Sequence, residues 1–254
     1  DCLLSRGLGD VYKRQSQSYS VYNMNLSYKS ILEGQLLLLD KPLEWTSFQV
    51  VNKVRWALTK KYNLKKLKVG HAGTLDPLAT GLLLICTGKM TKKISEFQAL
   101  EKSYTGTITL GATTPSYDLE TSFDNQFPID HITYNQLNEV KKQFEGEIEQ
   151  YPPVFSAIKK EGKPLYEYAR AGESPKIDPR KICIYNFDLT TIDLPQIHFY
   201  VKCSKGTYIR SLAHYYGKAL RSGAHLSQLR RTSIGTYGLE DALTPNQIIE
   251  KLEE

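Results

Sequence analysis

The sequence predicts one folded domain of the α+β class. Its 254 residues are 41% hydrophobic and 24% charged, an ordinary composition for a globular protein with a substantial core. Segments with the two-residue period of strands are interspersed with segments of helical period. They do not alternate strictly, as strands and helices do in a doubly wound fold, and this favours a mixed sheet. The longest apolar runs, residues 36–39 and 82–86, are far shorter than the ~20 residues that cross a bilayer, so no membrane-spanning segment is expected.

The first half of the chain is predicted to contain two strands and two helices. Short apolar runs predict the strands, and apolar side chains recurring on one face predict the helices. Ser47 suits the N-cap of the first helix, whose opposite face is basic. A stretch rich in Gly, Thr and Pro predicts a loop between the first helix and the second strand. The expected elements are a strand over 35–39, a helix over 47–62, the loop over 69–81, a strand over 82–86 and a helix over 91–100.

The second half is predicted to be richer in strands. Threonine alternates with Tyr, Ile and Leu over residues 104–110, which is the pattern of a half-buried strand. An acidic loop-and-helix segment follows and ends at Pro152-Pro153. Beyond it, the pattern predicts a short Tyr-rich helix, two strands and a turn into a last helix. These elements cover residues 165–170, 182–192, 197–203, 204–208 and 209–220.

The first 23 residues differ from the rest of the chain. They begin with Asp1, show neither helical nor strand periodicity, and lack the apolar core of a signal peptide. We expect them to be a non-native or disordered leader. Met24 then begins a single domain over residues 24–254.

Charge is segregated along the chain, although the net charge is only +6. Residues 41–68 carry a net +7 and residues 199–231 another +7, whereas residues 115–150 carry −6. If the two basic blocks meet in space, their combined field suits a polyanion such as a nucleic acid. Two separately solvated helix faces are the alternative interpretation.

Several classes of site are not supported by the sequence. The four cysteines form no Cys-x-x-Cys pair and have no histidines at zinc-ligand spacing, so neither a metal site nor a disulfide framework is expected. Reduced thiols of this kind are typical of a cytoplasmic protein. Six residues separate Gly81 from Gly88, where a phosphate-binding loop has four. No Ser or Cys lies in a nucleophile elbow.

Asp76 is the strongest candidate for a reactive side chain. A lone aspartate in a turn is usually a capping residue. Here Gly73, Pro77 and Gly81 surround it, which predicts a rigid backbone that a bulky ligand can approach closely. The apolar strand that follows provides firm support. A carboxylate held in this way is a candidate nucleophile.

Six strings between about residues 34 and 250 carry a family resemblance. In order, they are LLLLDKP (36–42), GHAGTLDPLATG (70–81), KSYTGTITLG (102–111), YPPVFSAIKKEGKPLYEYAR (151–170), CSKGTYIRSLA (203–213) and GAHLSQLRR (223–231). Together they resemble the TruB-type pseudouridine synthases. The resemblance implies the pseudouridine synthase fold, a mixed and mainly antiparallel central sheet flanked by helices and loops. It also implies conversion of a uridine in the T-loop of tRNA, position 55, into pseudouridine.

The resemblance implies a role for three catalytic residues. Asp76 aligns with the aspartate of the family that attacks either the ribose or the uracil ring of a base flipped into a pocket. Arg210 aligns with the arginine that pairs with this aspartate, and an arginine fork holds a carboxylate charged and oriented. Tyr104 aligns with the tyrosine expected to stack on the base, and it is a candidate to accept the proton from the carbon of that base.

Five further residues are implied to bind substrate. Tyr208 and Leu229 align with residues that line the pocket, and His71 aligns with a loop histidine that lies against the RNA. Lys41 and Lys205 are expected to face phosphate or to support the pocket. The resemblance implies neither a cofactor nor a metal.

The expected partner is the T-arm stem-loop of tRNA, bound by a monomer without an obligate protein partner. Many family members carry a C-terminal accessory RNA-binding (PUA) domain. Eleven residues follow Leu243, so we expect that domain to be absent and the two basic blocks to supply the affinity for tRNA. Residues 116–126 fall where the family has a mobile segment that closes over RNA.

Two other functions stay open at the level of sequence. The same basic blocks suit a non-catalytic factor that binds or folds tRNA. A glycosidase-like hydrolase is a third hypothesis, because one carboxylate near a glycosidic bond is half of that machinery. It requires a second acid in the pocket, and the motif around Asp76 supplies none.

Overall fold

The computed structural model describes residues 24–173 and 175–253, so the leader expected over residues 1–23 lies outside the described part. The strands are β1 (Leu36–Lys41), β2 (Val69–His71), β3 (Ala79–Thr87), β4 (Lys102–Leu110), β5 (Ala112–Thr113), β6 (Asn125–Gln126), β7 (Gly146–Gln150), β8 (Lys159–Lys160), β9 (Lys163–Pro164), β10 (Arg180–Asp193), β11 (Gln196–Cys203), β12 (Ala224–Ile234) and β13 (Tyr237–Gly238). The helices are α1 (Tyr28–Glu33), α2 (Ser47–Lys61), η1 (Gly88–Lys93), α3 (Ile94–Ala99), α4 (Tyr134–Lys142), α5 (Leu165–Arg170), α6 (Ile209–Ala219) and α7 (Pro245–Glu253).

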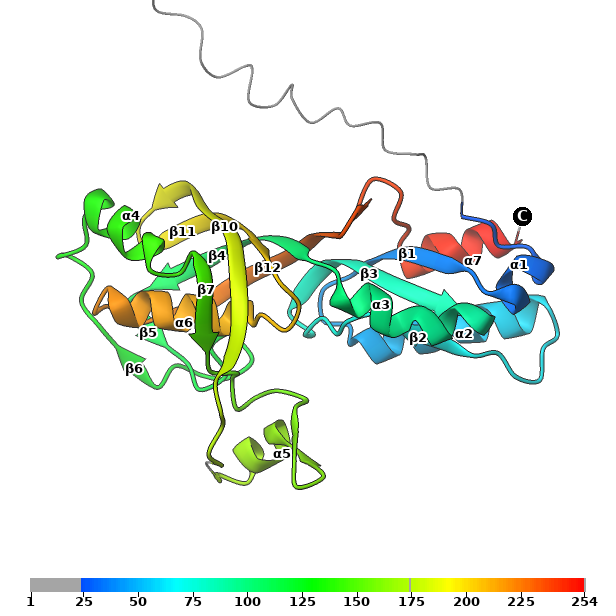
Figure 1. The fold of residues 1–254 in the computed structure, drawn as a ribbon, viewed down its shortest axis with the longest axis horizontal. Coiled ribbons are helices and arrows are strands. Elements are labelled where there is room, and N and C mark those ends of the chain that lie inside the picture. Colours follow the sequence, from blue (N-terminus) through cyan, green and yellow to red (C-terminus); the bar gives the residue numbers. More distant parts are fainter. Residues whose placement is uncertain (1–23, 174, 254) are drawn as a thin grey trace, which may run out of the picture.

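One long sheet unites two halves of an elongated molecule (Figure 1). Its strand order is β1-β3-β12-β4-β11-β10-β7, with β2 beside β3 and β13 beside β12. Neighbouring strands are antiparallel except β3 and β12, which run parallel. The expected α+β class with a mixed, mainly antiparallel sheet is therefore confirmed.

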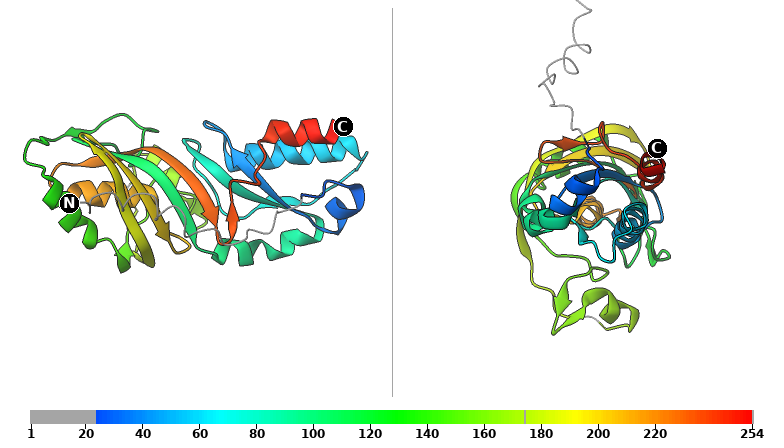
Figure 2. Two further views of the ribbon diagram at one scale, coloured as in Figure 1. Left: turned by 90° about the horizontal axis from the view of Figure 1, so that it is seen from above. Right: turned by 90° about the vertical axis from the view of Figure 1, so that its right-hand side faces the viewer.

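The strands β1 and β3 are apolar throughout because helices cover both of their faces. Leu37 and Leu39 of β1 belong to the core beneath α2 and α7, whereas Leu36 and Leu38 belong to the core on the other face, beneath α3. Figure 2 shows α2 and α7 together on one side of these strands and α3 on the other. A strand buried on both faces needs a continuous apolar run, which explains why short runs predicted these strands.

In the other half, α6 covers one face of the sheet. Ile108 of β4 and Tyr216 of α6 are fully buried in the same core. The threonines that alternate with the apolar residues of β4 point to the opposite face, where Thr107 Oγ1 lies 3.0 Å from His198 Nδ1. The alternation over residues 104–110 therefore predicted this strand correctly.

Several features of the fold differ from the prediction, and three of them bear on the site. The N-cap of α2 is Thr46, which forms a capping box with Gln49, and not Ser47. The expected loop over residues 69–81 contains β2 and the beginning of β3, because Ala79 pairs with Leu229 of β12. The strand β12 was not predicted, although it joins the two halves of the sheet.

No helix within residues 24–173 and 175–253 combines the length and the apolar character that a membrane crossing requires.

Candidate functional site

A cleft of about 660 Å³ opens where the two halves meet. The segment between β2 and β3 and the segment that leads into α6 form its walls, and β4 and β12 contribute from the sheet. Five of the eight predicted site residues line it: Asp76, Tyr104, Tyr208, Arg210 and Leu229. Residues up to 153 positions apart in the sequence therefore converge as the resemblance implied.

The loop that carries Asp76 is fixed by a hydrogen bond pair from α2. Ser47 Oγ accepts from the Leu75 amide at 2.9 Å and donates to the Leu75 carbonyl at 3.1 Å. Gly81 sits where β3 runs against β12, with a φ of +102°. A Cβ there would lie 2.2 Å from the Arg231 carbonyl oxygen, so only glycine permits this approach. The backbone on both sides of Asp76 is thus held rigidly.

Arg231 holds the other side of the same loop. Its guanidinium is buried and donates to the carbonyls of Leu82 at 2.7 Å and Gly73 at 3.1 Å. A buried guanidinium that satisfies backbone carbonyls serves the structure of the loop, although Arg231 also lines the cleft. Within the second basic block Arg231 is thus a buried residue and not a solvated base.

We expect Arg231→Met to destabilise the protein by about 3 kcal/mol or more, because it leaves buried carbonyls without donors. Chemical denaturation followed by circular dichroism measures this loss. Arg230→Met is the matched control, since Arg230 is 42% exposed and pairs with Asp40 nearer to solvent; its cost should be below about 1 kcal/mol. Equal losses in both variants would contradict the structural role of Arg231.

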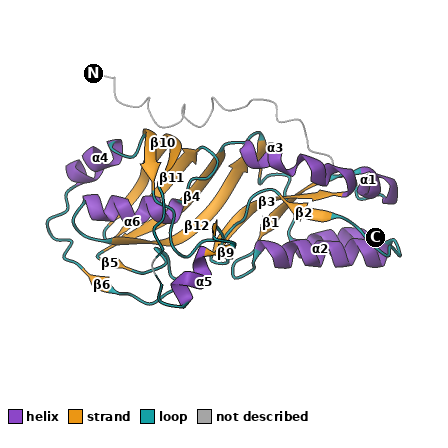
Figure 3. Cartoon of the chain, turned by 60° about the horizontal axis from the view of Figure 1, so that its bottom comes forward, coloured by secondary structure: helices purple, strands orange, loops and turns teal. Residues whose placement is uncertain are grey.

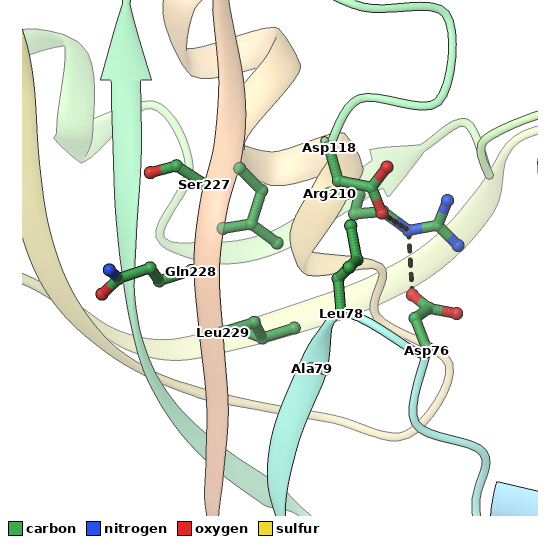
Figure 4. Close-up of a pocket in the computed structure, with 9 residues that line it drawn as sticks. Asp76, Leu78, Ala79, Asp118, Arg210, Ser227, Gln228 and Leu229 are labelled. Carbon is green, nitrogen blue, oxygen red and sulfur yellow. Dashed lines mark ion pairs between the residues drawn. The ribbon is translucent and has the colours of Figure 1, made fainter. Parts of the chain in front are cut away.

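The side chain of Arg210 lies between two carboxylates (Figure 4). Its Nε is 2.9 Å from Oδ2 of Asp76 and 3.6 Å from Oδ2 of Asp118. Its NH1 donates to the Ser116 carbonyl at 3.1 Å. Arg210 is 4% exposed, so it is not the surface base that a position on a helix would ordinarily suggest.

Asp118 is a site residue that sequence reasoning missed. It belongs to the acidic stretch 116–126. The composition and the turn residues of this stretch gave no signal to distinguish it from a solvated loop. In the structure its side chain is 7% exposed and its backbone bridges to Leu226 of β12. Tyr117 has a φ of +66° and stacks on His214 of α6 with ring centroids 3.8 Å apart. The beginning of the acidic stretch is thus packed against α6.

Two opposing influences act on the pKa of Asp76. Burial, the largest, raises this pKa above its ordinary 3.8, and the carboxylate of Asp118 raises it further. The charge of Arg210 lowers it. Because an aspartate attacks as the ionised form, an activity that depends on Asp76 should be lost as the pH falls through this raised pKa.

Asp118→Asn should therefore move the acid limb of kcat to lower pH. The substitution removes the negative neighbour that raises the pKa of Asp76 and leaves Arg210 paired with Asp76 alone. Single-turnover rates measured across the acidic range test this shift. A limb that stays in place or moves to higher pH would contradict the contribution of Asp118 to the raised pKa of Asp76.

Lys41 holds the backbone next to Asp76 in place. Its ammonium donates to the carbonyls of Pro42 at 2.9 Å and Pro77 at 3.2 Å, and also to that of Trp45. The residue is fully buried, and this burial lowers its pKa to about 8, an effect that Asp76 opposes. Of the two roles expected for Lys41, the contacts fit support of the pocket and not a contact with phosphate.

Tyr104 and Tyr208 line the cleft as largely buried phenols. Burial raises the pKa of each, so both are neutral at pH 7. A neutral aromatic ring suits stacking on a base. Gln150 fixes the backbone of Tyr208 through reciprocal hydrogen bonds to its amide at 2.8 Å and its carbonyl at 3.0 Å. Gln150, like Asp118 and Arg231, was not predicted from the sequence.

His71 and Lys205 do not line the cleft. His71 lies in β2, half-buried, and burial lowers the pKa of its imidazole, which is therefore neutral at pH 7. Lys205 is exposed in the turn between β11 and α6, beside residues of the cleft wall. That these two residues contact RNA remains a prediction.

The two basic blocks lie mostly in different halves of the molecule. The first follows α2 in one half of the molecule, and the second includes α6 in the other half (Figure 1). Three members of the blocks meet at the site, but Lys41, Arg210 and Arg231 are buried there among carbonyls and carboxylates. Within residues 24–173 and 175–253, no group of three or more His, Cys, Asp or Glu is placed to hold a metal ion.

Comparisons with known proteins identify the family of the chain. The family model described as TruB family pseudouridylate synthase (N terminal domain) matches residues 60–209. Two proteins named tRNA pseudouridine synthase B are similar to this chain. That of Flavobacterium johnsoniae is 61% identical over 87% of this chain and 97% of its own length. That of Phocaeicola vulgatus is 52% identical over 87% and 94%.

Among solved structures, the crystal structure of a Cbf5-Nop10-Gar1 complex contains a similar chain, with a TM-score of 0.64 and 31% identity. The similarity covers 87% of this chain, which spans about half (54%) of the length of that one. The match of the family model to more than half of the sequence, together with the nearly full-length relatives, shows that this chain belongs to the TruB family of pseudouridylate synthases.

Proposed function

We propose that this protein isomerises uridine to pseudouridine in tRNA, and that the uridine lies in the T-loop at position 55. The observation that carries the proposal is the Asp76–Arg210 ion pair of 2.9 Å, which lies beside Tyr104 and Tyr208 in one cleft. The names of the two relatives, tRNA pseudouridine synthase B, support tRNA as the substrate.

The reaction exchanges one bond for another without a net change in composition. The bond from C1′ of the ribose to N1 of uracil breaks, and a bond from C1′ to C5 forms. The hydrogen on C5 leaves, and N1 gains a proton. Asp76 acts as the nucleophile, adding to C1′ or to the uracil ring and leaving again when the new bond has formed. Arg210 keeps the carboxylate ionised and fixes its direction.

The target base has to leave the RNA stack to reach Asp76. Enzymes that act on a base commonly extrude it and read it by stacking and hydrogen bonds to its edge. The rings of Tyr104 and Tyr208 and the apolar side chain of Leu229 line the same cleft as Asp76. They supply the surfaces on which an extruded uracil would stack.

The hydrolase alternative gains one observation from the structure, because Asp118 is a second acid at the site. A glycosidase, however, places its two carboxyl groups on either side of the scissile bond. Asp76 and Asp118 instead approach the same Nε of Arg210, at 2.9 and 3.6 Å. This shared pairing fits a nucleophile with a supporting carboxylate better than an acid and a base that flank a sugar.

The test uses the purified chain alone and a T-arm hairpin labelled with tritium at C5 of uridine, without added nucleotide. We expect tritium release together with pseudouridine in the digested RNA. Free uracil would instead favour the hydrolase, and tight binding without either product would favour a tRNA-binding factor. Sedimentation of the same sample tests our proposal that the active form is a monomer that needs no protein partner.

A further inference from the structure

Five exposed lysines gather at the end of α2 and in the loop that follows it, in a region that we call the lysine end. They lie outside the catalytic cleft and have no part in the site described above. The lysine end consists of Lys60, Lys61, Lys65, Lys66 and Lys68.

The positive charge of the lysine end is not neutralised locally. Among the described residues, none of its five lysines takes part in an ion pair; Lys60 instead lies over the ring of Trp56 at 5.0 Å. From residue 45 to residue 95 the sequence has ten Lys and Arg residues and one acid, Asp76, which forms an ion pair with Arg210. A surface of this kind attracts a polyanion.

The lysine end is also hollowed. A depression of about 620 Å³ is lined by Lys65, Lys66 and Lys68 on one side and by Arg55 and Thr59 of α2 on the other. Arg55 is oriented by Asn52 and the Val69 carbonyl, so this wall is ordered. Leu67 is buried and anchors the loop, while the lysines on either side of it are exposed. The lysines are thus displayed around a concave surface.

The position of the lysine end matches an RNA that extends away from the cleft. The helix α2 begins at the site, where Ser47 holds Leu75, and its 15 residues carry it about 22 Å away. In Figure 1 the loop after α2 lies at the end of the molecule away from α4 and α6, and in Figure 3 α2 runs along the lower edge of its half.

A neighbouring groove is a weaker candidate. It runs between α2 and α7, has a volume of about 410 Å³, and is lined by Trp56 as well as by Lys60 and Lys61. Glu253 of α7 lies in its wall and opposes an anion. The depression around residues 65–68 has no acid among its lining residues and therefore fits phosphate better.

We propose that the lysine end binds the phosphate backbone of tRNA outside the T-arm, as a second contact that a T-arm hairpin does not reach. The inference rests on the proposed function for the identity of the RNA. Phosphate contacts of this kind position the substrate and do not read its sequence. The lysine end accordingly adds affinity for the whole tRNA and has no effect on the chemical step.

The test compares Lys61→Ala/Lys65→Ala/Lys66→Ala with the wild-type protein on a whole tRNA transcript and on the T-arm hairpin. We expect Kd for tRNA to rise and kcat/KM to fall by about tenfold. The slope of log Kd against log salt concentration should decrease in magnitude by about 2 to 3, because three phosphate contacts are lost. Both constants for the hairpin should stay unchanged. The triple Lys→Arg variant at these positions should restore binding, which excludes a loss of folding.

A matched control removes three charges elsewhere, in Lys142→Ala/Lys176→Ala/Lys181→Ala, at exposed positions outside both basic blocks and outside the cleft. Its affinity for tRNA should stay near that of the wild type. The inference is overturned if tRNA binding is unchanged in the first variant, if the hairpin loses as much as the tRNA, or if the control loses as much as the first variant. Failure of the proposed function is distinguishable, because the wild-type protein would then convert neither RNA while the Kd comparison still applies.

Discussion

Asp76→Asn is expected to abolish pseudouridine formation, with a loss of about 10⁴-fold or more in the single-turnover rate. The amide has the shape of the carboxylate but no charge, so it cannot add to the substrate. Arg210 would still find an oxygen at this position, and the loop is held independently by Ser47 and Arg231. Affinity for tRNA should therefore stay within about threefold of the wild type, a change of less than 1 kcal/mol.

The matched control is Asp40→Asn. Asp40 also pairs with an arginine, at 2.7 Å from NH2 of Arg230, but it lies outside the cleft. Its turnover should be close to that of the wild type. A fully active Asp76→Asn protein would rule out the nucleophile, and equal losses in both variants would show that the effect comes from the fold.

Arg210→Met is expected to have the second largest effect. It leaves the carboxylates of Asp76 and Asp118 close together without the cation that lies 2.9 and 3.6 Å from them. Since Arg210 lowers the pKa of Asp76, its removal raises that pKa further, and the acid limb of kcat should move to higher pH. At pH 7 the rate should fall by about 10²–10³-fold, as when a preorganised charged donor is lost.

The double variant Arg210→Met/Asp118→Asn separates the two contributions. Removing the second carboxylate should recover part of the stability and return the acid limb toward lower pH, because the remaining carboxylate no longer has a like-charged neighbour. Titration of kcat in both variants measures the recovery. An acid limb that is the same in the wild-type, single and double variants would contradict the proposed control of Asp76 by Arg210.

Much of the fold was predictable because local patterns determined it. The apolar runs of β1 and β3 and the threonine alternation of β4 reflect burial on two faces and on one face, respectively. The strand β12 was missed because its pattern is interrupted: Gln228 and Ser233 lie at register shifts against β4, and Arg231 is buried within it. Pairing with two different strands, which only the tertiary structure supplies, stabilises such a segment.

The candidate site likewise contains residues that the sequence predicted and residues that only the structure revealed. Asp76, Tyr104 and Arg210 were found through strings that resemble a known family, and the cleft brings them together. Asp118 and Arg231 were not found, because their roles depend on burial and on contacts more than 90 residues away in sequence. Likewise, the type of Ser47 predicted an N-cap, whereas Thr46 caps the helix and frees Ser47 to hold Leu75.

The most direct test of the account is mass mapping of a tRNA transcript after incubation with the wild-type protein and, in parallel, with Asp76→Asn. Chemical derivatisation specific for pseudouridine marks each converted position in the fragment spectrum. We predict one new pseudouridine, at position 55 of the T-loop, with the wild-type protein and none with the variant. An unmodified T-loop with the wild-type protein, or an equal modification with both proteins, would contradict it.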